Sequence, residues 1–580
     1  MKRCPQCHRI ETDDALAFCR ADGTALVSDS SSLGNEAGTA KLGSASAANE
    51  IETSVLPHST DANINRATAR TTVLPAQPAP LLAKRLPRFG PGKPLIAVGA
   101  LLVIAMGVGG YFFVRGKRDR PIESVAVLPF ENKSGNADSE YLSDGLAESL
   151  IYRLSQLSNL KVTPRSSAFR YKGKDVDAEK IGNELGVDAV MSGRLIQRGD
   201  DLTISVDLID VRNKKTIWGE QFQRKMSDLL ATQRDIASTI ADKLQLRLSG
   251  NDSKGISKQY TTNNEAYQLY LKGRFYWNKR NAEALKKSIE YFNQAIEKDP
   301  NFALAYAGLS DVYGQLPVYS GGSPRDNVPK AMAAAKKALE IDESIAEAHT
   351  ALGFELFYYE WNVPESNKEF QRAFELNPNY ATAHQWYGIW NLASTGRFDE
   401  AIAELKRAQE LDRLSLIINT NLGESYIYAR QYDKAIEQLR KTLELDQGFY
   451  RAHWTLGFAY ELKGSFSEAI AEYQKARALD DDPRELAMLG HAYATSGKRD
   501  EALKALDQLK ELAKRRYVSP INFVFIYVGL GEKDEAFQWL ETCYQERDPQ
   551  ITRLKVNPLF DPLRSDARFT ELMRRVGLPQ

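Results

Sequence analysis

The first residues whose types and spacing could do chemistry are the cysteines at the start of the chain. Cys4 and Cys7 form a C-x-x-C pair, and after eleven intervening residues Cys19 and Asp22 repeat that spacing with a carboxylate in the last position. Two such turns facing each other provide four ligands in a tetrahedral array for one metal ion, with no open position for catalysis. The spacing therefore predicts a structural Zn²⁺ site at Cys4, Cys7, Cys19 and Asp22, with His8 as an alternative fourth ligand.

This beginning resembles the short zinc ribbons that open many bacterial multidomain proteins, whose usual pattern is CPxCG followed by FCxxCG. The chain departs from that pattern twice, at His8 and at Asp22. A metal-free pair of turns is the alternative. A unit of this size is too small to fold without a metal or a partner. We predict a zinc-ribbon-like unit over residues 1–27.

A linker and an apolar run follow. Residues 28–92 are rich in Ser, Ala, Thr, Asn and Pro and cannot bury enough surface to offset their ordering entropy. Residues 95–114 are the only run of about 20 uncharged, mostly apolar residues, long enough to cross a bilayer as a helix. We predict a disordered linker over residues 28–92 and a transmembrane helix over residues 93–116, with a buried core helix as the alternative.

The flanking charges do not settle the orientation of this helix, because four basic residues precede it and four follow it. Thiolate ligands fit a reducing compartment, whereas the cysteine-poor remainder of the chain tolerates an oxidising one. We therefore expect a single-pass protein of a bacterial inner membrane. Its N-terminus lies in the cytoplasm in this interpretation, and everything after the helix lies outside the cytoplasm.

The composition excludes several classes of protein. The 580 residues include 76 basic and 76 acidic ones, and zero net charge argues against a protein that coats nucleic acid. Cys543 is alone after the apolar run, so that part has no disulfide framework. No G-x-x-x-x-G-K-[ST], H-E-x-x-H or G-x-S-x-G motif is present, and no kinase or cyclase signature precedes the apolar run. We expect no catalytic residues and no enzymatic activity.

Residues 121–250 are predicted to form a compact α/β domain. Residues 124–130 suit a buried strand, and a second strand is expected at residues 160–164. Apolar and polar residues alternate over residues 202–208 between two turns, which predicts an antiparallel meander. Leucines recur every four residues on one helix stripe, at Leu142, Leu146, Leu150 and Leu154.

The segments SVAVLPFENKSGNADSEYLSDGLAESLIYRLSQ and LGVDAVMSGRLIQRGDDLTISVDLIDVRNKKTIWGEQFQ resemble the TolB amino-terminal-like (FlgO-type) domain of bacterial envelope and signalling proteins. The resemblance covers the whole α/β unit. It implies a domain placed between a transmembrane helix and helical repeats. It carries over no catalytic residues.

The chain repeats itself from residue 263 onward. Gly353, Gly388, Gly423, Gly457 and Gly490 are separated by 35, 35, 34 and 33 residues. This is the tetratricopeptide period of about 34 residues. We predict about eight tetratricopeptide units over residues 263–550, stacked into a superhelix, and a C-terminal cap over residues 551–580. We treat the loop from residue 314 to residue 329 as surface filler or a contact arm.

The first helix of each unit forms the concave face of such a superhelix. Two interpretations of the aromatic residues there stay open: they line a groove for a peptide, or they pack between units. Histidines that recur at one position in their units are interpreted as packing residues and not as metal ligands; they are His349, His384 and His453. The candidate partner-binding residues are Phe354, Phe357, Tyr358, Tyr428, Trp454, Phe458 and His491.

The predicted fold class is therefore multidomain: a short zinc ribbon, a disordered linker, one transmembrane helix, an α/β TolB-like domain and an all-α tetratricopeptide superhelix. The leading functional hypothesis is a non-enzymatic membrane protein whose repeats bind protein or peptide partners in envelope signalling or assembly. One alternative is a membrane-bound transcriptional regulator whose ribbon contacts nucleic acid, although the ribbon has few basic residues. The other is a sensor subunit of a separate kinase or cyclase.

Overall fold

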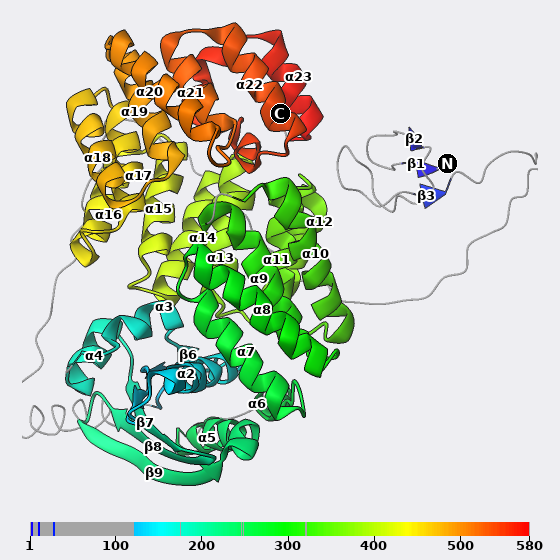
Figure 1. The fold of residues 1–580 in the computed structure, drawn as a ribbon, viewed down its shortest axis with the longest axis vertical. Helices are drawn as coiled ribbons and strands as arrows, with labels where there is room; N and C mark the ends of the chain where they lie inside the picture. The colour runs from blue at the N-terminus through cyan, green and yellow to red at the C-terminus, as the bar shows by residue number, and fades with distance from the viewer. Residues whose placement is uncertain are drawn as a thin grey trace, which may run out of the picture. The chain divides into compact units, whose positions relative to one another are not determined.

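The computed structural model describes residues 121–578, apart from residues 175, 245, 247–248 and 320–321, and three short strands within the first 120 residues (Figure 1). These strands are β1 (Lys2–Arg3), β2 (Ile10–Glu11) and β3 (Val27–Ser28), paired antiparallel in the order β2-β1-β3. The predicted linker and transmembrane helix lie outside the described residues. No helix among the described residues is long and apolar enough to cross a membrane.

The α/β domain is built on one mixed sheet with the strand order β6-β4-β7-β8-β9, and β5 also pairs with β7. β4 runs parallel to β6 and β7, whereas β7, β8 and β9 form an antiparallel meander. The strands are β4 (Ser124–Val127), β5 (Glu131–Asn132), β6 (Lys161–Val162), β7 (Ala189–Arg198), β8 (Asp201–Asp210) and β9 (Lys215–Lys225).

Helices cover both faces of this sheet. Its helices are α2 (Glu140–Ser155), α3 (Arg165–Ala168), α4 (Ala178–Leu185), α5 (Leu229–Lys243) and α6 (Gly250–Ser257). α2 and α5 pack on one face, where the four predicted leucines of α2 are fully buried. α4 packs on the other face through Ile181 and Leu185. The alternation predicted for residues 202–208 is confirmed, because the apolar side chains of β8 are buried and the intervening ones are half-exposed.

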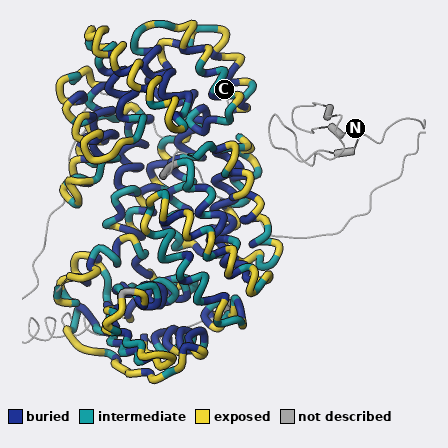
Figure 2. Tube along the Cα trace, in the orientation of Figure 1, coloured by how far each residue is buried: buried dark blue, intermediate teal, exposed yellow. Residues whose placement is uncertain are grey.

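An all-α array follows the α/β domain, as predicted. Sixteen helices from α7 to α22 form eight consecutive pairs, and their facing sides are buried (Figure 2). They are α7 (Asn264–Trp277), α8 (Ala282–Lys298), α9 (Ala303–Tyr319), α10 (Pro324–Ile341), α11 (Ala346–Tyr358), α12 (Val363–Leu376), α13 (Ala381–Trp386), α14 (Phe398–Leu411), α15 (Leu416–Tyr428), α16 (Tyr432–Leu445), α17 (Tyr450–Leu462), α18 (Phe466–Leu479), α19 (Pro483–Thr495), α20 (Arg499–Ala513), α21 (Ile521–Leu530) and α22 (Lys533–Gln545). A π-helical segment, η4 (Tyr387–Leu392), extends α13.

The repeated glycines let the two helices of a pair approach closely. A Cβ atom added at Gly423 would lie 2.7 Å from Leu439, and one added at Gly457 would lie 2.8 Å from Tyr473. Cβ atoms in proteins essentially never lie this close to another heavy atom, so a larger residue at either glycine would push the helices apart. The close approach explains why glycine recurs with the period of the unit.

The expected loop over residues 314–329 is mostly helical, which corrects the sequence interpretation. α9 continues through Pro317 to Tyr319, and α10 begins at Pro324. Pro317 lies in the last turn of α9, and Pro324 occupies the first position of α10, where a missing backbone N–H costs nothing.

The chain after α22 runs as two 3₁₀-helices, η5 (Pro549–Arg553) and η6 (Pro558–Leu563), and then α23 (Ala567–Val576). α23 packs on α22, and Arg575 forms an ion pair with Glu541 at 2.7 Å. The segment over residues 547–563, which we call the C-terminal segment, lies instead against earlier units of the array (Figure 1).

Candidate functional site

The seven candidate partner-binding residues are all buried, each with at most 9% of its surface exposed. Phe354 and Tyr358 stack at 4.6 Å, and Tyr358 meets Trp390 of η4 edge to face at 5.0 Å. Phe357 is fully buried, and His491 contacts Glu461 at 2.6 Å. Tyr428, Trp454 and Phe458 border a small cavity of about 20 Å³. These residues therefore pack between helices or under a covering segment.

The covering segment is the C-terminal segment. It lies on the inner face, which we define as the side of the array formed by the first helix of each pair. The cavity beside it is bordered by first helices (α15, α17, α19 and α21) and by Gln550, Arg553, Asn557 and Leu559. The array therefore holds a 3₁₀-helical stretch of its own chain where a partner peptide was expected.

Arg553 makes the main buried polar contacts between the C-terminal segment and the array. Its Nη1 lies 2.5 Å from Oε1 of Glu424 and donates to the hydroxyl of Tyr428 at 2.7 Å. Its guanidinium carbon lies 4.1 Å from the centre of the Trp390 ring. The side chains of Arg553 and Glu424 are only 5% and 4% exposed. Burial raises the pKa of Glu424, but the positive charge of Arg553, the hydrogen bond from Tyr428 and two further arginines together outweigh burial and lower that pKa.

Further contacts hold the C-terminal segment at both ends. The Arg547 guanidinium lies 4.2 Å from the Trp361 ring, in the turn between α11 and α12 of the third helix pair. Arg430 pairs with Asp561 at 2.8 Å, and both side chains are more than 40% exposed. The apolar side chains Ile551, Leu554, Val556, Leu559 and Phe560 are buried. The segment thus reaches from the eighth helix pair back to the third, fourth and fifth pairs.

The α/β domain covers the start of the array through buried ion pairs between α2 and α7. Glu148 of α2 pairs with Arg274 of α7 at 2.5 Å and with Arg165 at 3.1 Å, and Arg274 also pairs with Asp311 of α9 at 3.3 Å. The attraction of these arginines outweighs burial and lowers the pKa of Glu148. Beside them, a Cβ atom added at Gly145 would lie 3.0 Å from Leu271, so α2 and α7 pack closely.

A second contact joins the α/β domain to the turn between α14 and α15. The hydroxyl groups of Ser166 and Ser167 donate to the Asp412 carboxylate. Arg170 donates to the backbone carbonyl of Leu445 at 2.8 Å. Burial raises the pKa of Asp412 to about 6. The α/β domain therefore spans the first helix pair and the fourth and fifth pairs.

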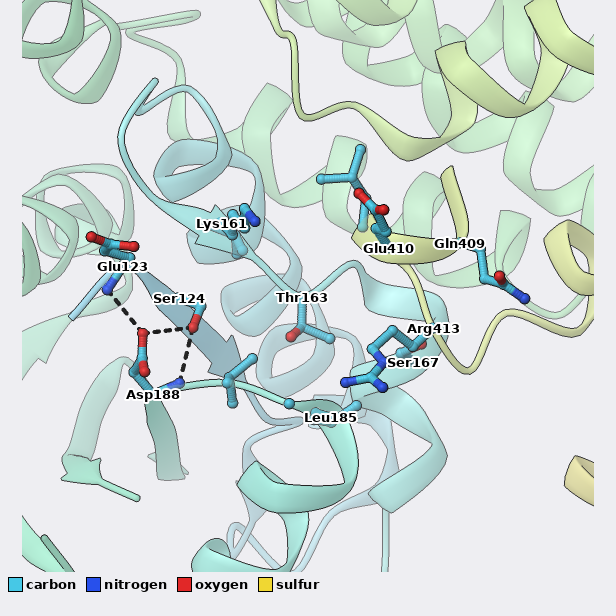
Figure 3. Close-up of a pocket in the computed structure, with 14 residues that line it drawn as sticks. Glu123, Ser124, Lys161, Thr163, Ser167, Leu185, Asp188, Gln409, Glu410 and Arg413 are labelled. Atoms are coloured by element: carbon cyan, nitrogen blue, oxygen red, sulfur yellow. Dashed lines mark hydrogen bonds between the residues drawn. The ribbon is translucent and has the colours of Figure 1, made fainter. Parts of the chain in front are cut away.

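A pocket of about 620 Å³ lies beside this second contact (Figure 3). It is bounded by the starts of β4 and β6, by the turn before β7 and by the end of α14. Ser124 donates to Asp188 at 2.9 Å in its wall. Acidic and basic side chains line it in similar number, so it does not select a ligand by charge; they are Glu123, Asp188, Glu410, Lys161 and Arg413.

The three repeated histidines form the same contacts in each unit, in agreement with a packing role. Each Nδ1 faces a glutamate of the second helix, and each Nε2 faces a backbone carbonyl six residues earlier. The three pairs are His349 with Glu369 at 2.6 Å, His384 with Glu404 at 2.6 Å and His453 with Glu472 at 2.5 Å. Among the described residues, no group of three or more His, Cys, Asp or Glu could hold a metal ion.

The predicted metal ligands Cys4, Cys7, Cys19 and Asp22 lie outside the described residues. Trp390, Glu424 and Arg553 were not among the site residues predicted from the sequence. Two signals could have found the charged pair: Glu424 interrupts the apolar helix LIINTNLGESYIY, and Arg553 stands between apolar residues in ITRL. A charge inside an apolar run is rarely buried without a partner.

Comparisons with known proteins agree with this division of the chain. Residues 122–239 match the second domain of HilA/YgeH-like transcriptional regulators. Residues 420–483 and 486–515 match tetratricopeptide repeats. The chain therefore combines tetratricopeptide repeats with a HilA/YgeH-like second domain.

One curated relative is putative adenylate cyclase 3 of Rhizobium meliloti, which is 32% identical over 238 residues. The match covers 40% of this chain and 40% of the length of the cyclase. Among solved structures, Pseudomonas aeruginosa PilF is 25% identical with a TM-score of 0.29 and covers 37% of this chain and 92% of its own. YrrB, a tetratricopeptide protein with an unusual peptide-binding site, is 23% identical with a TM-score of 0.24 and covers 33% and 93%.

Proposed function

We propose that this protein is a regulatory protein without enzymatic activity, whose repeats bind a protein or peptide partner and whose α/β domain is braced against the array. Tetratricopeptide arrays bind peptide or protein partners. The observation that carries the proposal is the C-terminal segment, because the inner face already accommodates a short 3₁₀-helical stretch of chain around Arg553. The match to HilA/YgeH-like regulators supports a regulatory role.

The setting that we propose is the bacterial inner membrane, with residues 93–116 as a single span and a zinc ribbon at the N-terminus. The TolB amino-terminal-like resemblance of residues 121–250 supports a role in envelope signalling or assembly. Reporter fusions after Gly90 and after Gly250 test the orientation: only the second should be active outside the cytoplasm. Zinc content measured in the full chain and in a Cys4→Ser, Cys7→Ser variant tests the metal site.

A second candidate function is that of a sensor for a separately encoded nucleotide cyclase. The similarity to a putative adenylate cyclase over 40% of the chain favours it. In this case the purified chain should make no cyclic AMP from ATP, but a cyclase should co-purify with it. A transcriptional role through the ribbon would instead give salt-sensitive DNA binding by the full chain.

The proposed function is tested by photo-crosslinking in living cells. A photoreactive residue is placed at exposed array positions, Leu479 and Leu503, and at other exposed array positions in turn. A matched control position is Lys225 on β9, whose side chain is 55% exposed. We expect a discrete crosslinked partner from array positions and none from Lys225. Absence of a crosslink from every array position would contradict the proposal.

A further inference from the structure

We propose that the inner face at Trp390, Glu424 and Tyr428 is a binding site for an arginine-bearing segment of a partner protein, and that Arg553 occupies it in cis. This inference rests on the proposed function, because it names the chemistry of the partner that the array binds. The C-terminal segment competes with that partner for the site.

The walls of the site belong to the array and not to the segment that fills it. Trp390 lies in η4, while Glu424 and Tyr428 lie one turn apart on α15. The Tyr428 hydroxyl donates to Glu424 at 2.8 Å, so the two groups are fixed relative to each other without Arg553. π-helical segments such as η4 occur often at functional sites, because the extra residue turns side chains toward a ligand. The array therefore builds this pocket from residues that are distant from Arg553 in sequence.

The pocket fits a guanidinium better than an ammonium group. A planar, weakly hydrated guanidinium stacks on an aromatic ring and donates to a carboxylate in the same plane, whereas an ammonium is a strongly hydrated point charge. Arg553 uses both contacts, with Trp390 at 4.1 Å and Glu424 at 2.5 Å. An arginine side chain is therefore the ligand chemistry that this pocket selects.

The flanking residues add a second requirement. Ile551 and Leu554 on either side of Arg553 are fully buried, and they lie in or next to a 3₁₀ turn and not in an α-helix. A partner segment must therefore present arginine between apolar residues in a short 3₁₀ turn. It must also replace the apolar contacts of the C-terminal segment, so its apparent affinity is reduced by the small population of chains whose site is open.

The fit of the C-terminal segment leaves donors unused. Within the described part of the chain, Arg553 Nε and the indole N–H of Trp454 are buried without a hydrogen-bond partner. Both residues border the cavity of about 20 Å³ next to the segment. Buried donors are normally satisfied, so a partner segment that paired the Trp454 indole N–H and all N–H groups of its own guanidinium would bind better than the C-terminal segment does.

The segment can leave the site while the end of the chain stays folded. α23 is held on α22 by its own contacts, since the guanidinium groups of Arg568 and Arg575 lie over the Phe537 and Tyr544 rings of α22 at 4.1 Å and 3.9 Å. The polar contact at the far end of the segment, Arg430 with Asp561, is exposed and therefore weak. Release of residues 547–563 would uncover Trp390, Glu424 and Tyr428 and the neighbouring first helices that border the cavity.

The test is a binding titration with the full chain carrying Arg553→Glu, which places a carboxylate against Glu424 and opens the site. The probe is a fluorescent peptide with the sequence of residues 546–566, measured by anisotropy. We expect this peptide to bind the variant at least tenfold more tightly than it binds the wild-type chain. Peptides with lysine or alanine at the position of Arg553 should bind at least tenfold more weakly, and Glu424→Gln in the same variant should abolish the preference for arginine.

Equal binding of the arginine, lysine and alanine peptides would overturn the proposal, as would a preference for arginine that survives Glu424→Gln. If the Arg553→Glu chain does not fold, the wild-type chain is titrated with millimolar arginine peptide or lysine peptide. Amide hydrogen exchange of residues 549–563 should then rise with arginine only, and no change would also overturn the proposal. A crosslinked partner on the array together with a negative titration would leave the proposed function intact.

Discussion

The α/β domain and the C-terminal segment both cover part of the array, but different contacts attach them to it. The α/β domain covers the start of the array through the Glu148 and Arg274 network, through helix packing at Gly145, and through a second contact at Asp412. The C-terminal segment covers the middle of the inner face through one buried ion pair and a row of apolar side chains on 3₁₀ turns. The α/β domain is part of the folded core, whereas the C-terminal segment is short and, in our proposal, a partner can displace it.

The largest expected effect comes from the junction between α2 and α7. Glu148→Ala removes the nearest carboxylate from the largely buried Arg274 and Arg165 and leaves only longer contacts with Asp311 at 3.3 Å and Asp144 at 3.9 Å. We expect this loss to cost about 3 kcal/mol of the free energy of unfolding. Urea unfolding measured by tryptophan fluorescence checks it. A matched control is Glu265→Ala, whose exposed pair with Lys298 contributes less than about 1 kcal/mol. Equal losses in the two variants would show that the junction is not a buried network.

A smaller effect is expected at the C-terminal segment. Arg553→Ala lowers the free energy of unfolding by about 2 kcal/mol, because the segment can detach locally and let water reach Glu424. Limited proteolysis should then cut within residues 547–563 while the rest of the chain resists. Arg430→Ala is the control, since the exposed pair with Asp561 is worth less than about 1 kcal/mol. Global proteolysis of the Arg553→Ala chain would argue against a separable segment.

The smallest expected effect is the pH-dependent contribution of His453 to the free energy of unfolding. The hydrogen bond to Glu472 is the main cause that raises the pKa of His453. A raised pKa means that this stabilisation is complete below the unfolded pKa of about 6.5 and is lost as the pH rises through the folded pKa. We expect His453→Gln to remove on the order of 1 kcal/mol at pH 6 and less at pH 8. Thermal unfolding of both chains at the two pH values measures the difference.

The protonation of Glu355 changes over a neighbouring pH range, so this residue provides the control. Burial raises its pKa to about 8, so the protonated form is favoured in the folded chain, and stability falls as the pH rises from about 4.5 to about 8. Glu355→Gln should flatten the pH profile of stability between about pH 4.5 and about pH 8 and leave the effect of His453→Gln unchanged. If Glu355→Gln abolished the effect of His453→Gln, the two groups would be coupled, against the separate contacts of the two side chains.

Local patterns in the sequence predicted the elements of the fold. The leucine stripe of α2, the alternation of β8 and the spacing of the glycines each reflect contacts within one element or between neighbouring helices. Such contacts repeat with a fixed period, so one chain is enough to find them. The prediction of a loop at residues 314–329 was wrong, because prolines at helix ends cannot be told from prolines in loops by sequence alone.

The site could not be predicted in the same way, because its parts have no common period. The aromatic residues Tyr428 and Trp454 were found from their positions in the units, but they border the cavity beside the C-terminal segment, which those positions do not reveal. Arg553 lies 129 residues from Glu424, and no rule of spacing links them. Contacts between distant segments depend on the curvature of the array, which the period alone does not give.

The most direct test of this account is amide hydrogen exchange in the full chain, comparing the wild type with Arg553→Ala. The account predicts that residues 549–563 are protected in the wild type and lose protection in the variant, while α2 and α7 exchange equally slowly in both chains. Residues 549–563 that exchange without protection in the wild type would contradict it, as would a loss of protection that occurs only together with α2 and α7.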